Sequence, residues 1–142
     1  MKKSLYVLLV IILLCFSNMS IADEDPRLFV QMPDMMQKHM LSNMRDHLAA
    51  INEILENMSK GLLDKAAEVA ESRIGMSSLE SHGASHMAKF MPEGMRNAGN
   101  KMHRAASRFA LKAQEGDALA AYGALTDVTA ACVACHSAYR IR

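Results

Sequence analysis

Two cysteines and a histidine near the C-terminus form the pattern with the clearest chemical meaning in this 142-residue chain. They stand in the segment Cys132-Val133-Ala134-Cys135-His136. A C-x-x-C-H segment is the attachment signature of c-type haem, in which each thiol adds to a haem vinyl group and the histidine binds the iron. Because positions three and four apart share a face of a helix, Cys132, Cys135 and His136 are expected to point to one side. The sequence therefore predicts one covalently bound haem c.

Two other interpretations of the cysteine pair are weaker. A thioredoxin-like redox pair is expected in a βαβ setting, and the chain has no strand-rich pattern. A zinc site would need two further ligands at suitable spacing, and no second cysteine pair is present. The adjacent histidine, the exported context and the helical flanks favour haem, and a haem-free C-x-x-C thiol oxidoreductase remains as a remote alternative.

The first 22 residues have the composition of a secretory signal peptide. A basic start and an apolar run over 5–16 precede a small-x-small pattern that ends at Ala22. We predict cleavage after Ala22, which removes Cys15 and leaves one domain over 23–142. The apolar run is short for a transmembrane helix, so an uncleaved anchor is the less favoured alternative. Export and haem attachment together imply the periplasm, with no stable membrane association after cleavage.

The charge balance bears on the partners of the mature chain. Cleavage would reduce the basic count from 16 to 14 against 15 acidic residues, so the net charge would change from +1 to −1. This balance offers no basic excess for nucleic acid. The sequence also gives no basis for hydrolytic chemistry, and we expect an electron carrier rather than an enzyme.

The mature chain has an all-α pattern of four helical segments. Asp34 is a suitable N-cap, Pro92 suits a first helical turn, and Gly61 and Gly116 are suitable helix ends. The helices are predicted over 34–59, 62–74, 92–115 and 117–139. An irregular lead-in over 23–32 precedes them, and a longer connection over 75–91 separates the second helix from the third. Amphipathic helices joined mostly by short loops predict an antiparallel four-helix bundle.

Apolar spacing predicts which side of each helix faces the core. The expected inner face of the first helix comprises Met36, Met40, Met44, Leu48, Ile51, Leu55 and Met58. That of the third helix comprises Met95, Ala98, Met102, Ala106, Phe109 and Ala113. In the last helix, Leu125 and Val128 share a stripe with the C-x-x-C-H residues. Most of the methionines are expected to fill the core. His82, His86 and His103 are expected at the surface, with metal binding by His82 and His86 as a weak alternative.

The end of the chain resembles the class II c-type cytochromes, the cytochrome c′ family. The similarity is carried by Cys132-Val133-Ala134-Cys135-His136-Ser137-Ala138-Tyr139-Arg140, which matches a C-x-x-C-H-x-x-Tyr-Arg pattern at the end of a four-helix sequence. The resemblance implies a cytochrome c′-like bundle that encloses the haem. It implies that His136 is the proximal iron ligand and that Arg140 lies beside it. It also implies that a homodimer can form through the first two helices.

The sixth position on the iron separates two branches of this family. The resemblance implies either an apolar distal residue, which leaves five-coordinate iron that binds NO or CO, or a methionine from the first helix. A His/Met pair suits electron transfer because the soft thioether favours Fe(II). We predict Met44 as the distal ligand, with Met40 as the fallback and His47 as a rival. The predicted function is periplasmic one-electron transfer with transient redox partner proteins, toward which Arg104 and Arg108 are candidate steering charges.

Overall fold

The computed structural model describes residues 24–142. The predicted signal peptide over 1–22 and its cleavage site lie outside these residues. Within them the chain is mostly helical with almost no strand, which is consistent with the all-α class. The helices are α2 (Asp34–Ser59), α3 (Leu63–Arg73), the short α4 (Ala84–Ala88), α5 (Glu93–Gln114) and α6 (Ala118–Ala138), with a 3₁₀ turn over Met76–Ser78.

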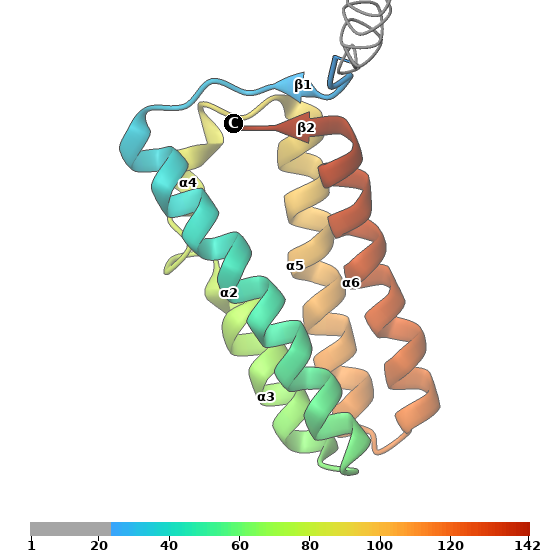
Figure 1. The fold of residues 1–142 in the computed structure, drawn as a ribbon. Coiled ribbons are helices and arrows are strands. Elements are labelled where there is room, and N and C mark those ends of the chain that lie inside the picture. Colours follow the sequence, from blue (N-terminus) through green and yellow to red (C-terminus); the bar gives the residue numbers. More distant parts are fainter. Residues whose placement is uncertain (1–23) are drawn as a thin grey trace, which may run out of the picture.

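The four longer helices form two hairpins that lie against each other (Figure 1). One hairpin joins α2 to α3 through Gly61, and the other joins α5 to α6 through Gly116. Both glycines have the left-handed φ that ends a helix at low cost, 71° at Gly61 and 82° at Gly116. Asp117 caps α6, because its side chain accepts a hydrogen bond from the Ala120 amide at 3.0 Å. The predicted ends of all four helices are confirmed to within one residue, but Asp34 is the first residue of α2 rather than its N-cap, and Pro33 stands at the N-cap without a side-chain hydrogen bond.

Two apolar clusters hold the hairpins together. The larger one is built on small side chains, and Ala66, Ala67 and Ala70 of α3 are completely buried in it beside Ile54 of α2 and Phe109 of α5. These alanines let α3 approach its neighbours closely, which compensates for the few aromatic side chains. The smaller cluster lies where α2 and α5 begin and α6 ends. It is rich in methionine and contains Val30, Met32, Met40, Met87 and Met95, and we call it the methionine cluster.

The inner face of α2 differs from the predicted one. Met40 and Met58 are buried as expected, but Leu48 is 73% exposed and Leu55 is 42% exposed. The buried positions of α2 are instead Met40, Asn43, His47, Ala50, Ile54 and Met58. This face contacts α3, and its polar residues Asn43 and His47 lie against His82 in the connection that follows α3. The predicted face followed the large apolar residues of α2, whereas the buried face also includes small and polar residues. The prediction of this face was therefore wrong. On α5, by contrast, the predicted face is buried apart from the half-buried Ala98.

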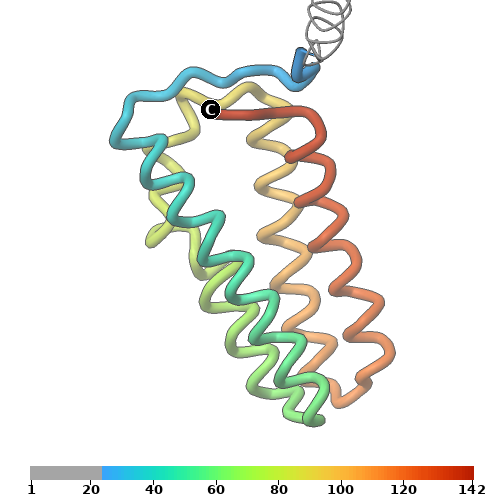
Figure 2. Tube along the Cα trace, viewed as in Figure 1, coloured from blue at the N-terminus to red at the C-terminus, as the bar shows by residue number. Residues whose placement is uncertain are grey.

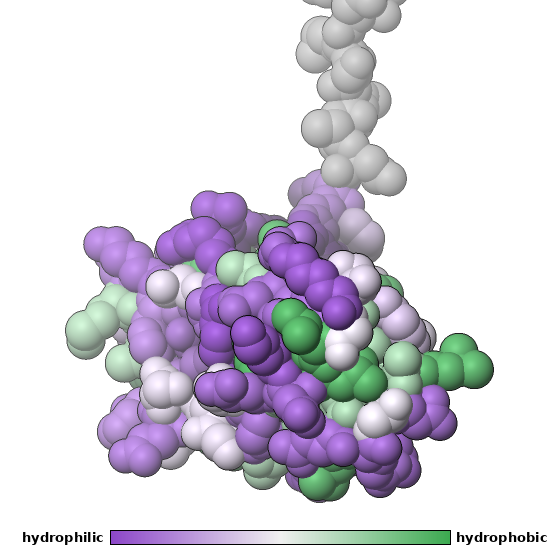
Figure 3. Space-filling model, turned by 90° about the horizontal axis from the view of Figure 1, so that it is seen from below, coloured by the Kyte–Doolittle hydropathy of each residue, from purple (hydrophilic) through white to green (hydrophobic). Residues whose placement is uncertain are grey.

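The lead-in before α2 is more regular than predicted. Its strand β1 (Leu28–Phe29) pairs in parallel with β2 (Tyr139–Arg140), and these two-residue strands form the sheet of the described region. The tube in Figure 2 shows this early segment running beside the C-terminus across one end of the molecule. The opposite end carries the two hairpin loops, where apolar side chains interrupt a mostly polar surface (Figure 3).

Candidate haem-attachment site

The two thiols of the C-x-x-C-H segment lie on the last two turns of α6. The buried stripe of this helix runs through Ala121, Leu125, Val128 and Ala131. Cys132 and Cys135 continue the stripe and are half-buried and free. Cys132 packs against the larger apolar cluster and Cys135 against the methionine cluster. The pair therefore stands at the junction of the two clusters.

The electrostatic setting of these thiols keeps them protonated. Burial raises the pKa of the Cys132 thiol. Burial, followed by the neighbouring Cys132, raises the pKa of Cys135 as well. Both residues also lie near the C-terminal end of a helix, where the dipole disfavours a thiolate. An arrangement of this kind does not activate a thiol as a nucleophile.

His136 does not share the burial of the two cysteines. The residue is exposed, whereas Cys132 and Cys135 are half-buried. One residue along a helix turns the side chain by about 100°, and this separates His136 from the adjacent Cys135. The carbonyl oxygen of His136 accepts a hydrogen bond from Arg27 Nη1 at 3.3 Å.

The candidate distal methionines belong to the same apolar cluster as Cys135. Met40 is a buried member of the methionine cluster, only 6% exposed. Met44 is half-buried and packs against this cluster, as do Cys135 and Tyr139. The structure therefore brings both predicted thioethers to the apolar region that also receives one thiol of the C-x-x-C-H segment. The choice between Met44 and Met40 as a ligand stays a prediction.

Much of α6 is apolar and uncovered. Apolar residues lie on all sides of this helix, yet Val133 is 65% exposed and Leu119 is 83% exposed. Only 17% of its most apolar 18-residue stretch is buried. Among residues 24–142 it is the one helix long and apolar enough to cross a membrane, a property shared by core helices of soluble proteins. One side of α6 packs against α5, and the rest of its apolar surface, including Leu119 and Val133, faces solvent.

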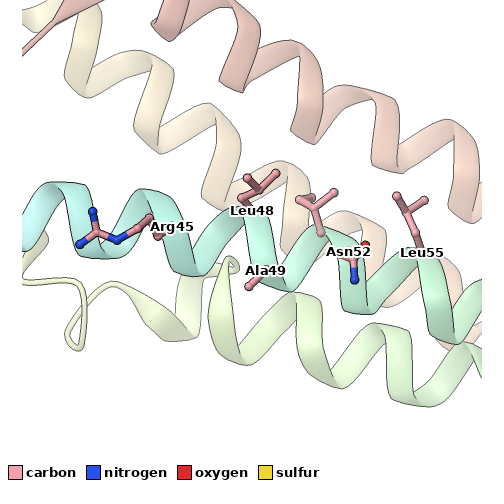
Figure 4. A pocket seen from close by; sticks show the side chains of 6 residues that line it. Arg45, Leu48, Ala49, Asn52 and Leu55 are labelled. Atoms are coloured by element: carbon pink, nitrogen blue, oxygen red, sulfur yellow. The ribbon is translucent and has the colours of Figure 1, made fainter.

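A second uncovered apolar surface lies on α2. Leu48 and Leu55 point to the side of α2 on which α5 and α6 run (Figure 4). Together with Arg45 and Ile51 they line an open hollow of about 530 Å³. All six side chains that line this hollow belong to α2, so the leucines that were predicted to face the core border an open hollow on the surface of that helix.

Arg140 is tied to the lead-in segment. Its guanidinium carbon lies 5.0 Å from the centroid of the Phe29 ring. Its Nε lies 3.7 Å from Asp25 Oδ2 and has no hydrogen-bond partner. Arg140 follows His136 by four residues, in the strand after α6. Its predicted role beside the proximal ligand stays a prediction.

Three histidines that were expected to be exposed or to compete for the iron form a buried cluster. His47, His82 and His103 are 7%, 8% and 8% exposed, so the prediction that His82 and His103 lie at the surface was wrong. Their ring centroids lie 4.8 Å apart for His47 and His82, 5.6 Å for His82 and His103, and 6.1 Å for His47 and His103. His86 is exposed, as predicted. Within the described region, no three His, Cys, Asp or Glu side chains form a group that could hold a metal ion.

Hydrogen bonds fix this histidine cluster between three segments. His103 Nδ1 donates to the Ile74 carbonyl at 2.6 Å, since a carbonyl can only accept. The His82 carbonyl accepts from Asn43 Nδ2 and from His39 Nε2, each at 3.0 Å. Thus α2, α5 and the connection before α4 meet here. A polar position within an otherwise apolar stripe was the available sequence signal, because Asn43 and His47 stand one turn apart on α2.

Two of the three histidines, His47 and His82, have lowered pKa values that favour the neutral ring. Burial, followed by the nearby His82 and His103, lowers the pKa of His47 to about 4. Burial and then His103 lower the pKa of His82. His47 Nδ1 is buried without a hydrogen-bond partner, which leaves the ring poorly placed to hold a proton. These groups act as packing and hydrogen-bonding elements.

Comparison with models of known protein families, with curated proteins and with solved structures finds no match to this chain.

Proposed function

We propose that this chain is a c-type cytochrome of the class II type, an antiparallel four-helix bundle that carries one covalent haem and transfers single electrons. The observation that carries the proposal is the placement of a C-x-x-C-H segment on a helix whose apolar surface is largely uncovered. Its two thiols are free and half-buried, and Cys135 packs against the methionine cluster. Thioether bonds to Cys132 and Cys135 would hold the haem, and His136 would be the proximal ligand.

The uncovered surfaces fit a large apolar group. Val133 flanks the thiols on α6, and Leu48 and Leu55 lie exposed on α2. Burial of such side chains is favourable by about 25 cal/mol per Å² of apolar area removed from water. Arg45 lines the same hollow as the leucines, and a guanidinium pairs well with carboxylates such as the propionates of haem. A haem that covered both surfaces would therefore increase the stability of the folded protein.

The methionines on α2 would decide the coordination of the iron. When bound with His/Met ligands, the haem supplies a one-electron redox centre whose reduced state the thioether favours. Met44 remains our first choice as distal ligand, with Met40 as the fallback. Met40 is the more deeply buried of the two, and Met44 follows it by about one helical turn on the same side of α2. Around either thioether, the apolar side chains exclude water from the site.

The cellular setting follows from the same proposal. The signal peptide predicted over 1–22 would deliver the chain to the periplasm, where c-type haem is attached. Exposed basic side chains on α5, among them Arg104 and Arg108, would meet acidic redox partners in weak and transient complexes. Neither nucleic acid nor a stable membrane contact is part of the proposal, and dimerisation through α2 and α3 is an expectation from the family resemblance.

A second candidate function is reversible binding of NO or CO to five-coordinate iron. It requires that neither Met44 nor Met40 reaches the iron, and the half-buried position of Met44 is compatible with this. The third candidate, a haem-free thiol oxidoreductase, is disfavoured by chemistry. Its attacking cysteine needs a lowered pKa, whereas the pKa values of Cys132 and Cys135 are both raised.

Optical spectra of the protein produced with haem-maturation machinery distinguish the three candidates. A low-spin ferric spectrum with the weak far-red methionine-to-iron band is expected for the electron carrier. A high-spin spectrum that changes when CO is added to the reduced protein would identify the gas-binding alternative. Absence of any haem absorption would exclude both.

Two matched variants test the distal ligand. Met44→Ala should convert the low-spin spectrum to a high-spin one, and Met40→Ala should leave it low-spin. The reverse pattern would move the ligand to Met40. Retention of the low-spin spectrum in both variants and in the double variant would point to a different distal group, with His47 as the next residue to replace.

A further inference from the structure

The segment before α2 reaches across the molecule to the residues around His136. Residues 25–32, which we call the strap, contain β1 and end in two buried side chains, Val30 and Met32. The register of the parallel pair places Leu28 opposite Tyr139 and Phe29 opposite Arg140. The Val30 amide donates to the Arg140 carbonyl at 2.8 Å. The strap is therefore anchored in the methionine cluster and bonded to the end of the chain.

Arg27 of the strap donates a hydrogen bond to a backbone carbonyl near the end of α6. The last carbonyls of a helix have no partner within it, and the chain leaves the helical path at Tyr139 to enter β2. The Tyr139 amide still donates to the Cys135 carbonyl. The next carbonyl, that of His136, accepts from Arg27 Nη1 at 3.3 Å. A cation at this end of a helix is also favoured by the helix dipole.

Asp25 fixes the direction of Arg27. Its carboxylate accepts from Arg27 Nε at 2.9 Å and from Nη2 at 2.6 Å, which leaves Nη1 free to reach His136. The same carboxylate lies 3.7 Å from Arg140 Nε. Hydrogen bonds from Arg27 lower the pKa of Asp25 to about 2, so Asp25 is ionised at neutral pH. Arg27, Asp25 and Arg140 thus form a network with one net positive charge beside the backbone of His136.

We propose that Arg27 is a positioning residue for the proximal ligand, and that the strap holds the C-x-x-C-H turn in place and adds a positive charge to its surroundings. This inference rests on the proposed haem function. The side chain of His136 is exposed. The contact of Arg27 is with the backbone carbonyl of His136, and through it Arg27 can hold the residue in position. A positive charge close to the iron favours the reduced state. Loss of Arg27 should therefore loosen this turn and lower the reduction potential.

The test compares Arg27→Gln with Arg108→Gln in the full-length, haem-loaded protein. Arg108 is an exposed arginine of α5 whose one ion pair is with Asp127 at 3.6 Å, so its variant makes the same charge change away from the strap. Arg27→Gln should lower the midpoint potential more than Arg108→Gln. It should also speed amide exchange at Val30 and Tyr139 at least several-fold, whereas the control should leave both amides unchanged.

The outcomes separate this inference from the function on which it rests. A parent protein without covalent haem contradicts the proposed function, and in that case amide exchange in the haem-free chain still tests the strap. A haem-loaded Arg27→Gln protein with the potential and exchange rates of the control overturns the positioning role. Arg27→Lys, which keeps the charge but lacks the planar fork, should restore the potential and leave the exchange fast.

Discussion

Acidification should destabilise the protein through the buried histidine cluster. In the unfolded chain a histidine has a pKa near 6.5, whereas the pKa of His47 in the folded chain is lowered to about 4. Between these values the unfolded chain binds the extra proton, so stability is complete above about pH 6.5 and decreases as the pH falls toward 4. From pH 7.5 to pH 5 the loss from His47 alone is about 2 kcal/mol, since each pKa unit corresponds to about 1.4 kcal/mol. The lowered pKa of His82 adds to the loss in the same direction.

The choice of pH range isolates the histidines from the carboxylates. Asp46, next to His47, has its pKa lowered by hydrogen bonds from Arg73, so its stabilising contribution is lost only at more acidic pH. Reversible urea unfolding at pH 7.5 and pH 5, followed by far-UV circular dichroism, measures the change in the free energy of unfolding. In His47→Gln this change should be smaller than in the parent by about 2 kcal/mol.

The control for this experiment is His86→Gln, which replaces an exposed histidine of α4. It should keep the full pH dependence of the parent. If His47→Gln shows the same loss of stability between pH 7.5 and pH 5 as the parent, His47 is not held neutral by its surroundings.

Further predictions concern packing at named positions. Gly94→Ala should destabilise the protein by about 1–3 kcal/mol, because a methyl group there would overlap the Tyr139 hydroxyl. Gly99→Ala on the same helix meets no atom within 4 Å and should be neutral or stabilising by up to about 1 kcal/mol, with thermal unfolding as the measurement for both. Ile54→Ala should cost about 2–5 kcal/mol in urea unfolding, because Ile54 is 1% exposed. Leu48→Ala should cost less than about 1 kcal/mol in the haem-free chain and clearly more in the haem-loaded protein, and equal costs in the two forms would argue against haem next to Leu48.

The helix boundaries were predictable because local chemistry determines them. Asp117 caps α6 with its own side chain, and Gly61 and Gly116 adopt the left-handed backbone that ends a helix. The inner face of α5 was equally predictable from the sequence, since its arginines and lysines are all exposed opposite a stripe of methionine, alanine and phenylalanine. Such strong segregation leaves one orientation for the helix.

The orientation of α2 depends on its neighbours and was mispredicted. Its leucines and its buried stripe are offset by one residue, and the alanines of α3 determine which side is buried. The histidine cluster joins His47, His82 and His103, which are far apart in sequence, so its existence depends on tertiary packing. Arg27 had no local signal at all, because its contact with His136 spans 109 residues. The sequence identified the residues whose side chains could take part in chemistry, and the fold determines which of them lie close together.

The central claim is that Cys132 and Cys135 carry a covalent haem. The most direct test is the intact mass of the purified, denatured protein after production with haem-maturation machinery and extraction with acidified organic solvent. We predict the mass of the mature chain plus one haem, and the loss of this added mass in the Cys132→Ala, Cys135→Ala double variant. A parent chain that has the mass of the polypeptide alone after this treatment, or haem that is removed by the solvent, would contradict the claim.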